Sequence, residues 1–363
     1  MVRWLALSED NLRGVWSRPT KQNTQAMIKH MTKLTGWTAS LVALAATASA
    51  DVKVNDYLSL NGYAAAAATY SDPANGPKSN STFFNSGNPE LDVLKVAAVG
   101  KYGDFGGKVS LLYVPNGGTT AGARTNDTSG ILDSYVTYTK EEFTVTAGKF
   151  LSYLGYEAFD TSNMTQLTYG STFFAIPAYH TGAKVDYAAK TWGAGIAVVD
   201  SVYNPGSSGW APYAQGDGKF DRTGTEAYVS YTGIDKLTLW VGGAYDNEVV
   251  TGPVTFDTWA SYALNAKTTL AAEFDTQESV GKGYLAEVQY AFSDKLSGIV
   301  RVSAEDVSGG DTGGYYTVAP TYKITSALSV RGEVSYADAS EGTAGAVIKS
   351  RGFFYGVQAL FVF

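Results

Sequence analysis

The sequence GFFYGVQALFVF, residues 352–363, alternates in a strict period of two. Successive side chains of a strand point to opposite sides, so one face of this stretch collects every second residue. That face carries Phe353, Tyr355, Val357, Ala359, Phe361 and Phe363. It is wholly apolar and closes on an aromatic residue, where most soluble domains have a short polar tail. The stretch predicts a strand whose apolar face is covered by a protein core or by a lipid bilayer.

The same alternation recurs through the C-terminal half of the chain. In residues 328–338, LSVRGEVSYAD, apolar side chains share one face, and Arg331 and Glu333 lie on the other. Residues 268–275, 283–292 and 297–306 divide in the same way. Their polar faces carry Glu273, Glu287, and Arg301 with Glu305, respectively. Each segment is therefore predicted to be a half-buried strand.

The connections between these segments alternate in length. Short connections occur at 103–107, 139–143, 188–191, 233–236, 265–268, 293–295 and 324–327. Long ones occur at 71–90, 115–130, 151–177 and 203–222, with shorter glycine-rich stretches near 247, 278, 309 and 342. Tight turns at one end and long loops at the other are typical of an up-and-down transmembrane barrel. Seven tight turns, with both termini at the turn end, predict sixteen antiparallel strands, and fourteen to eighteen fit the pattern.

Composition favours this all-β architecture over a soluble sandwich. The 363 residues include 40 Gly, 25 Tyr, 16 Phe and 7 Trp, and only 17% are charged. Aromatic girdles at the two membrane interfaces would account for the aromatic content, which a sandwich core would not. Cysteine is absent, so the chain has no disulfide framework, thiolate metal site or cysteine nucleophile. The formal net charge of −7 provides no basic surface for nucleic acid.

The start of the chain is typical of a secreted protein. Within residues 27–50, Lys29 and Lys33 precede a short apolar stretch, and Ala48-Ser49-Ala50 forms a small-residue cleavage site. We expect residues 27–50 to be a signal peptide and residues 51–363 to be the barrel. Residues 1–26 precede this signal and are expected to be a mis-assigned upstream extension.

The C-terminal stretch resembles the terminal strand of bacterial outer-membrane proteins. Tyr355, Phe361 and Phe363 occupy the positions of the signature that the barrel assembly machinery is understood to recognise in such proteins. The resemblance implies that this machinery is a partner of the chain. It also implies insertion into the outer membrane of a Gram-negative bacterium.

The longest connection between predicted strands carries a second resemblance. Gly148-Lys149 end a strand, and the loop that follows contains Gly155-Tyr156-Glu157 and Asp160. This arrangement resembles the third loop of general bacterial porins, which folds into the barrel and narrows it. The run GKFLSYLGYEAFDTSN, residues 148–163, together with PAYHTG, residues 177–182, resembles the OmpL-like β-barrel porin family more closely. These resemblances imply a passive channel for small hydrophilic solutes, with loop 151–177 folded into the lumen. They also imply a homotrimer.

Charged residues on the loop and wall are candidates for the constriction. A sixteen-strand barrel leaves an aqueous lumen, and opposed charges across a narrow passage would filter polar solutes. We expect Glu157 and Asp160 to face basic residues of the wall; alternatively, they hydrogen-bond to backbone amides and hold the loop in place. The basic candidates are Lys149, Lys184, Arg301 and Arg331. Strict alternation points Lys149 outward, so it turns inward only if its strand is bulged.

Strand parity assigns ten acids and six bases to the lumen, which predicts a weak preference for cations. The acids are Asp133, Asp186, Glu226, Asp246, Asp257, Glu273, Asp275, Glu287, Glu305 and Glu333, and the bases are Lys95, Lys101, Lys108, Lys184, Arg301 and Arg331. If these charges pair with one another, pore diameter alone decides selectivity. Trp240 and Trp259 also have inward parity and could stack against sugars, which leaves a saccharide-specific channel as an alternative.

Other functions find little support in the residues. Downstream of the leader the only histidine is His180, and Asp186, six residues on, is about 20 Å further along an extended strand. We therefore expect no catalytic site, no metal site and no cofactor, and we expect His180 to anchor the loop. The first strand begins soon after residue 51, which leaves no room for the plug of an energised receptor. A non-conducting adhesion or structural barrel remains the alternative from another class.

Overall fold

The computed structural model describes residues 51–74, 76–86, 88, 90–120, 123–174, 176–202, 223–246, 253–307, 311–339 and 351–363. The expected signal peptide and upstream extension lie outside these residues. Within them, eighteen strands form one antiparallel sheet. The strands are β1 (Val52–Lys53), β2 (Leu58–Pro73), β3 (Ser79–Ser81), β4 (Val93–Tyr102), β5 (Phe105–Thr120), β6 (Ala123–Lys140), β7 (Phe143–Leu151), β8 (Tyr179–Ala188), β9 (Trp192–Val199), β10 (Gly224–Tyr231), β11 (Leu237–Asp246), β12 (Val254–Asn265), β13 (Thr268–Gln277), β14 (Gly281–Ala291), β15 (Leu296–Val307), β16 (Asp311–Lys323), β17 (Leu328–Ala339) and β18 (Gly352–Val362).

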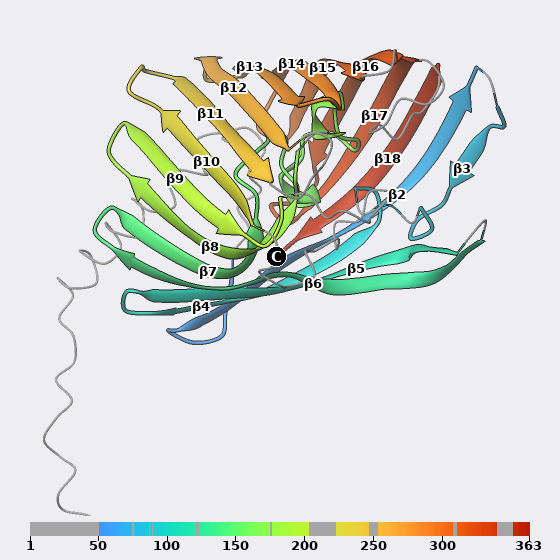
Figure 1. Ribbon diagram of the computed structural model, residues 1–363. Coiled ribbons are helices and arrows are strands. Elements are labelled where there is room, and N and C mark those ends of the chain that lie inside the picture. The colour runs from blue at the N-terminus through green and yellow to red at the C-terminus, as the bar shows by residue number, and fades with distance from the viewer. Residues whose placement is uncertain are drawn as a thin grey trace, which may run out of the picture. The chain divides into compact units, whose positions relative to one another are not determined.

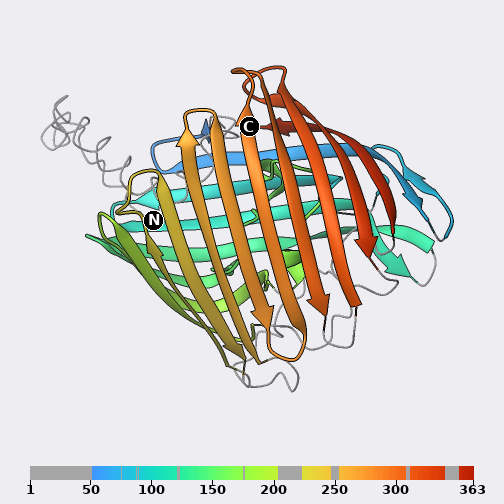
Figure 2. The ribbon, with the colours of Figure 1, turned by 90° about the horizontal axis from the view of Figure 1, so that it is seen from above.

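The sheet closes on itself as a barrel (Figures 1 and 2). β1 and β3 are two and three residues long, and the other sixteen strands make the wall in the described part of the chain. β18 pairs with β2, with Phe361 opposite Ala64, and this pairing joins the last strand to the first wall strand. Closure leaves no edge with unpaired backbone groups, which a lipid bilayer requires. The predicted sixteen-strand barrel is confirmed.

The wall is apolar outside and charged inside, the reverse of a soluble protein. On β15, Val300 and Val302 are 53% and 45% exposed, whereas the intervening Arg301 is 2% exposed. On β14 the alternation is unbroken from Gly281 to Tyr290. A soluble sandwich buries its apolar face. An exposed apolar face that continues from strand to strand instead fits contact with lipid.

The described hairpins follow the predicted turns closely. All seven short connections separate consecutive strands, and β4 and β5, for example, pair up to Tyr102 opposite Phe105. The expected long loop at 115–130 is wrong. β5 and β6 continue through most of it, with Gly118 opposite Asn126 and Thr120 opposite Ala123. Backbone pairing extends this hairpin although its Gly- and Thr-rich sequence has no apolar period of two, which is why the pattern missed it.

In the described part of the chain, no helix has the length and apolar character needed to cross a membrane. Among the described residues, the short 3₁₀ helices η2 (Thr161–Asn163) and η3 (Ser171–Phe174) belong to the connection between β7 and β8. That connection, residues 152–178, lies within the barrel (Figure 1, green).

Candidate pore and its inserted loop

Wall carboxylates hold the first part of the inserted loop through its backbone N–H groups. Gly155 N donates to Asp257 on β12 at 2.6 Å, and Tyr156 N donates to Glu273 on β13 at 2.6 Å. The Tyr156 hydroxyl donates to Glu287 on β14 at 2.9 Å. These contacts fix the loop against three consecutive strands.

The next loop residue, Glu157, binds the following strand, β15, through a buried ion pair with Arg301. Glu157 is 8% exposed and Arg301 is 2% exposed. The same carboxylate accepts from Gln166 Nε2 at 2.6 Å and from the N–H of Gly170, so it also joins two parts of the loop. Arg301 donates in addition to the carbonyl of Thr168 at 2.8 Å. The pair is thus surrounded by further hydrogen bonds, which a buried ion pair needs to offset its desolvation.

Asp160, three residues after Glu157, is bound to a different part of the wall. Lys95 on β4 donates to its two carboxylate oxygens at 2.6 and 2.9 Å. Lys95 also lies 3.4 Å from Asp133, which Lys108 contacts at 3.0 Å. In the order of the barrel, β16, β17, β18 and β2 lie between β15 and β4. The segment from Glu157 to Asp160 therefore runs inside the barrel between two parts of the wall that these strands separate.

The loop then returns to β17, where an arginine and a glutamate bind its backbone. Arg331 donates to the carbonyls of Thr161 at 2.7 Å and Met164 at 2.8 Å. Glu333, two residues along and on the same face, accepts from the N–H of Leu167 at 2.6 Å and of Thr168 at 3.0 Å. The guanidinium of Arg331 thus binds backbone C=O groups of the loop, and the carboxylate of Glu333 binds its N–H groups. These backbone groups belong to a segment that forms no sheet of its own.

The comparisons agree with this architecture. The model of the family described as Putative beta-barrel porin-2, OmpL-like, matches residues 57–363. The chain belongs to this family. Among solved structures, a substituted form of the Rh. blastica porin is 18% identical, with a TM-score of 0.56, and the match covers 84% of this chain and 100% of that one. OmpT of Vibrio cholerae is 13% identical with a TM-score of 0.54, covering 86% and 100%. No curated protein matches the chain in sequence.

Family and fold together support a porin-like outer-membrane barrel, a channel rather than an enzyme. The suspected resemblance to the OmpL-like porins is confirmed. At these identities the solved structures show the fold alone. In the described residues, no group of three or more His, Asp or Glu side chains has the geometry of a metal site.

Lys149 and Lys184 lie apart from the loop acids of this porin-family barrel. Lys149 is buried, with its Nζ donating to the carbonyl of Ile131 at 2.6 Å. Gly148, just before it, has φ of +130°, and a Cβ there would lie 2.2 Å from the carbonyl oxygen of Ser134. This glycine interrupts the strict alternation of β7, where Lys149 and Phe150 are both buried. Lys184 lies over the ring of Tyr153, 4.5 Å from its centroid.

The two remaining acids of the predicted constriction accept tyrosine hydroxyls of the wall. Asp186 accepts from Tyr228 at 3.4 Å, and Glu305 accepts from Tyr315 at 3.0 Å. In both cases donor and acceptor belong to strands rather than to the inserted loop.

His180 lies beside the start of the loop. Its Nε2 is 2.8 Å from Oε1 of Glu226, and its Nδ1 is 3.0 Å from the carbonyl oxygen of Ser201. Glu226 also accepts from Ser152 Oγ at 2.8 Å and from Tyr153 N at 3.1 Å. His180 therefore contacts the carboxylate that binds the first residues of the loop.

The inward tryptophans form an aromatic stack underneath the loop. Trp240 and Trp259 are parallel, with ring centroids 5.9 Å apart and an interplanar angle of 3°, and Tyr228 continues the stack on Trp240. The loop residues Tyr153 and Tyr156 pack against Tyr228 and Trp259. Both indoles are buried, so they are covered by the loop rather than presented to a solute.

The C-terminal aromatics lie where the strand pattern puts them. Tyr355 and Phe361 point outward and are 42% and 46% exposed. Phe363 exchanges two backbone hydrogen bonds of 2.9 Å with Gly62 at the barrel seam.

Lys95 and Glu90 bind the loop but are not among the residues predicted to form the constriction. Lys95 has inward parity, yet nothing in the sequence pairs it with Asp160, 65 residues away. Glu90 lies in the connection before β4 and is fully buried at the loop, where Tyr169 N donates to it at 3.3 Å. Burial raises the pKa of Glu90 to about 8, more strongly than the hydrogen bond from Tyr169 lowers it. The sequence signal for Glu90 is weak, because it precedes the strand rather than lying on it.

Proposed function

We propose that this protein is an outer-membrane porin that passes small hydrophilic solutes and ions by passive diffusion, with loop 152–178 as its constriction. The observation that carries the proposal is a loop segment inside the barrel that is held at both ends, by Glu157 bound to β15 and by Asp160 bound to β4. A segment held at both ends cannot swing aside without breaking two ion pairs. Solutes then pass beside this segment, and its position sets the width available to them.

We further propose a weak preference for cations. The loop acids and the wall bases Arg301, Lys95 and Lys108 are paired with one another or with Asp133. The acids on β12 to β14 form no ion pair among the described residues, although Arg301 lies opposite Glu287 across β14 and β15. Asp257, Glu273 and Glu287 bond mainly to neutral groups. An excess of negative charge along the lumen raises the local concentration of cations.

The setting of the channel follows from the same proposal. The mature chain would begin at Asp51, fold in the outer membrane of a Gram-negative bacterium with the help of the barrel assembly machinery, and associate as a homotrimer. Its tight turns would face the periplasm and its long loops the exterior.

Planar-bilayer recording of the refolded residues 51–363 tests the proposal. We expect stepwise openings in KCl and a cation-directed reversal potential under a salt gradient. Glu157→Gln and Asp160→Asn should each reduce that potential and alter conductance, because each removes a charge and loosens the segment held between these residues. Glu142→Gln, which changes an exposed acid in the tight turn between β6 and β7, is the matched control and should change neither quantity. A folded barrel that stays silent would instead favour an adhesion or structural role.

A further inference from the structure

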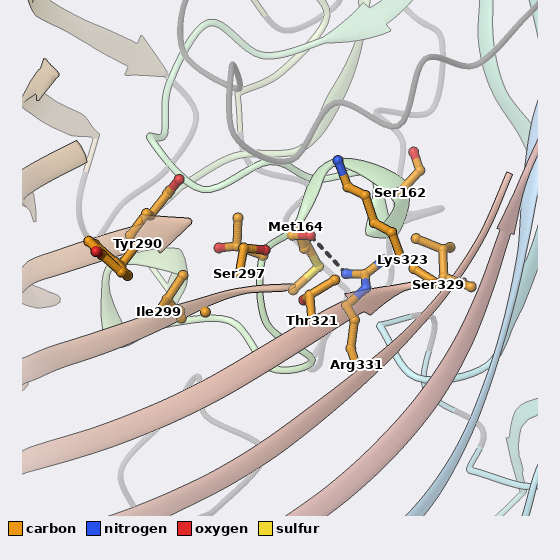
Figure 3. A pocket seen from close by; sticks show the side chains of 13 residues that line it. Ser162, Met164, Tyr290, Ser297, Ile299, Thr321, Lys323, Ser329 and Arg331 are labelled. Atoms are coloured by element: carbon orange, nitrogen blue, oxygen red, sulfur yellow. Dashed lines mark hydrogen bonds between the residues drawn. The ribbon is translucent and has the colours of Figure 1, made fainter. Parts of the chain in front are cut away.

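A pocket lies at the tight-turn end of the barrel, between the inserted loop and the wall (Figure 3). The pocket is open to solvent on one side. The loop contributes Ser162, Met164 and Thr165, and strands β14 to β18 contribute the rest. The wall residues are those next to the turns at 292–295 and 324–327, which places the pocket near that mouth of the pore.

The lining of this pocket differs from the rest of the lumen because it has no acidic side chain. Its charged residues are Lys323 at the end of β16 and Arg331 on β17. Hydroxyl and amide groups surround them: Ser162, Thr165, Gln289, Ser297, Thr321 and Ser329. Donor-rich, cationic surroundings with no carboxylate suit an oxyanion and disfavour a cation.

The two cations are neighbours on adjacent strands. Lys323 pairs with Ser329, and Arg331 lies two residues further along β17, opposite Thr321. Such diagonal neighbours on one face of a sheet are about 7–8 Å apart, within reach of one small ligand. Figure 3 shows both side chains beside the loop residues Ser162 and Met164.

Neither cation forms an ion pair in the described structure, although Glu333 lies two residues from Arg331 on the same face and interacts with it electrostatically. The guanidinium of Arg331 is 1% exposed and bonds only to carbonyl oxygens, of Thr161, Met164 and Gln166. Glu333 is occupied by Leu167, Thr168 and Ser335 and forms no ion pair with it. Lys323 likewise makes no ion pair in the described part of the chain. A buried positive charge that forms no direct ion pair is costly, and binding an anion beside it offsets part of that cost.

We propose that this pocket binds small oxyanions, namely the phosphate or carboxylate group of a hydroxylated solute. Lys323 makes the direct contact, Arg331 contributes charge from behind the loop carbonyls, and the hydroxyls bind the uncharged part of the solute. The proposal rests on the proposed porin function only in that solutes reach the pocket through the pore. It gives a weakly cation-preferring channel a local site for anions near its turn-end mouth.

Binding is tested on the full barrel in detergent micelles, without reference to conduction. ³¹P NMR line broadening measures the binding of inorganic phosphate, and calorimetric titration measures the binding of gluconate. Glucose is the uncharged counterpart of gluconate. We expect both anions to bind and glucose not to bind. Lys323→Gln should weaken anion binding about tenfold, as expected for loss of a charge-assisted hydrogen bond, and Lys323→Arg should retain it. If only phosphate or only gluconate binds, the site is specific for the phosphate or for the carboxylate group, respectively.

Lys267→Gln is the matched control, because it removes an exposed lysine from another tight turn that does not line the pocket. Equal loss of binding in Lys267→Gln and Lys323→Gln would overturn the site and leave only a general effect of charge. Absence of anion binding to the unchanged barrel would overturn it as well.

A second readout separates this proposal from the porin function. In bilayers, phosphate added to the turn-end side should reduce the current of the unchanged protein and of Lys267→Gln more than that of Lys323→Gln. Phosphate binding to a barrel that never conducts would support the pocket and contradict the porin function. A barrel that conducts but does not bind phosphate would support the porin function and contradict the pocket.

Discussion

At the scale of single residues, the lumen is organised by the backbone of the inserted loop. Asp257, Glu273 and Glu333 each accept at least one loop N–H, and Arg331 donates to loop carbonyls. A loop without regular structure has many unpaired backbone groups, and each one left buried without a partner costs about 1–3 kcal/mol. Much of the inward charge is therefore explained by the need to seat the loop, in addition to any effect on passing ions.

Glu90 provides a test of this seating through pH. Its pKa of about 8 lies above the ordinary value of 4.5, so between these values the folded protein holds a proton that the unfolded chain has lost. The free energy of unfolding therefore falls as pH rises through this window, by at most about 1.4 kcal/mol per pH unit from this group. Glu90→Gln should remove this contribution. Denaturant midpoints read by tryptophan fluorescence at pH 5, 6.5 and 8 measure the difference in slope.

Glu278→Gln is the control for that measurement, because Glu278 is exposed in the connection between β13 and β14. It should keep the pH slope of the unchanged protein. If Glu90→Gln also keeps the full slope, Glu90 does not hold a proton at neutral pH and its burial against the loop is not as described.

At the scale of elements, the inserted loop is a separate piece packed against a rigid wall. η3 rests on β15 through Ser171, whose Oγ lies 3.1 Å from the Oγ of Ser303. The chain has no cysteine, so a pair introduced here has no competing thiol. Ser171→Cys with Ser303→Cys should form a disulfide on mild oxidation, and mass spectrometry of the digested barrel detects it.

The oxidised protein should conduct as the reduced one does, because the disulfide holds the loop where it already lies. Ser171→Cys with Ser261→Cys, whose second site is a buried serine on β12, is the control pair and should remain reduced. A disulfide that forms only slowly and then lowers conductance would mean that the loop lies elsewhere in the conducting channel.

The wall was predictable from sequence, whereas the seating of the loop was not. A period of two placed Arg301, Arg331 and Glu333 on the inner face, because strand geometry alone decides which way a side chain points. It could not name the loop backbone groups that Arg331 and Glu333 bind, since Leu167 and Glu333 are 166 residues apart and the loop has no period. The hairpin at 115–130 was missed for a related reason: backbone pairing sustains it without an amphipathic face.

At the scale of the whole molecule, a closed sheet with an apolar exterior surrounds a lumen that holds the inserted loop. Closure satisfies the backbone of the wall, and ion pairs on β15 and β4 hold the loop segment from Glu157 to Asp160. We propose that this segment, rather than the wall, sets the width of the passage. A sixteen-strand barrel without an inserted segment has a wide aqueous lumen.

The most direct test is the size limit of the pore, measured from single-channel conductance with polyethylene glycols of graded mass in the bath. The unchanged protein is compared with a variant in which residues 156–170 are replaced by a short Gly-Ser linker, after heat-modifiable electrophoretic migration has shown that both are folded. We expect the variant to conduct more and to admit distinctly larger polymers. An identical size limit in the two folded proteins would contradict the role of the loop as the constriction.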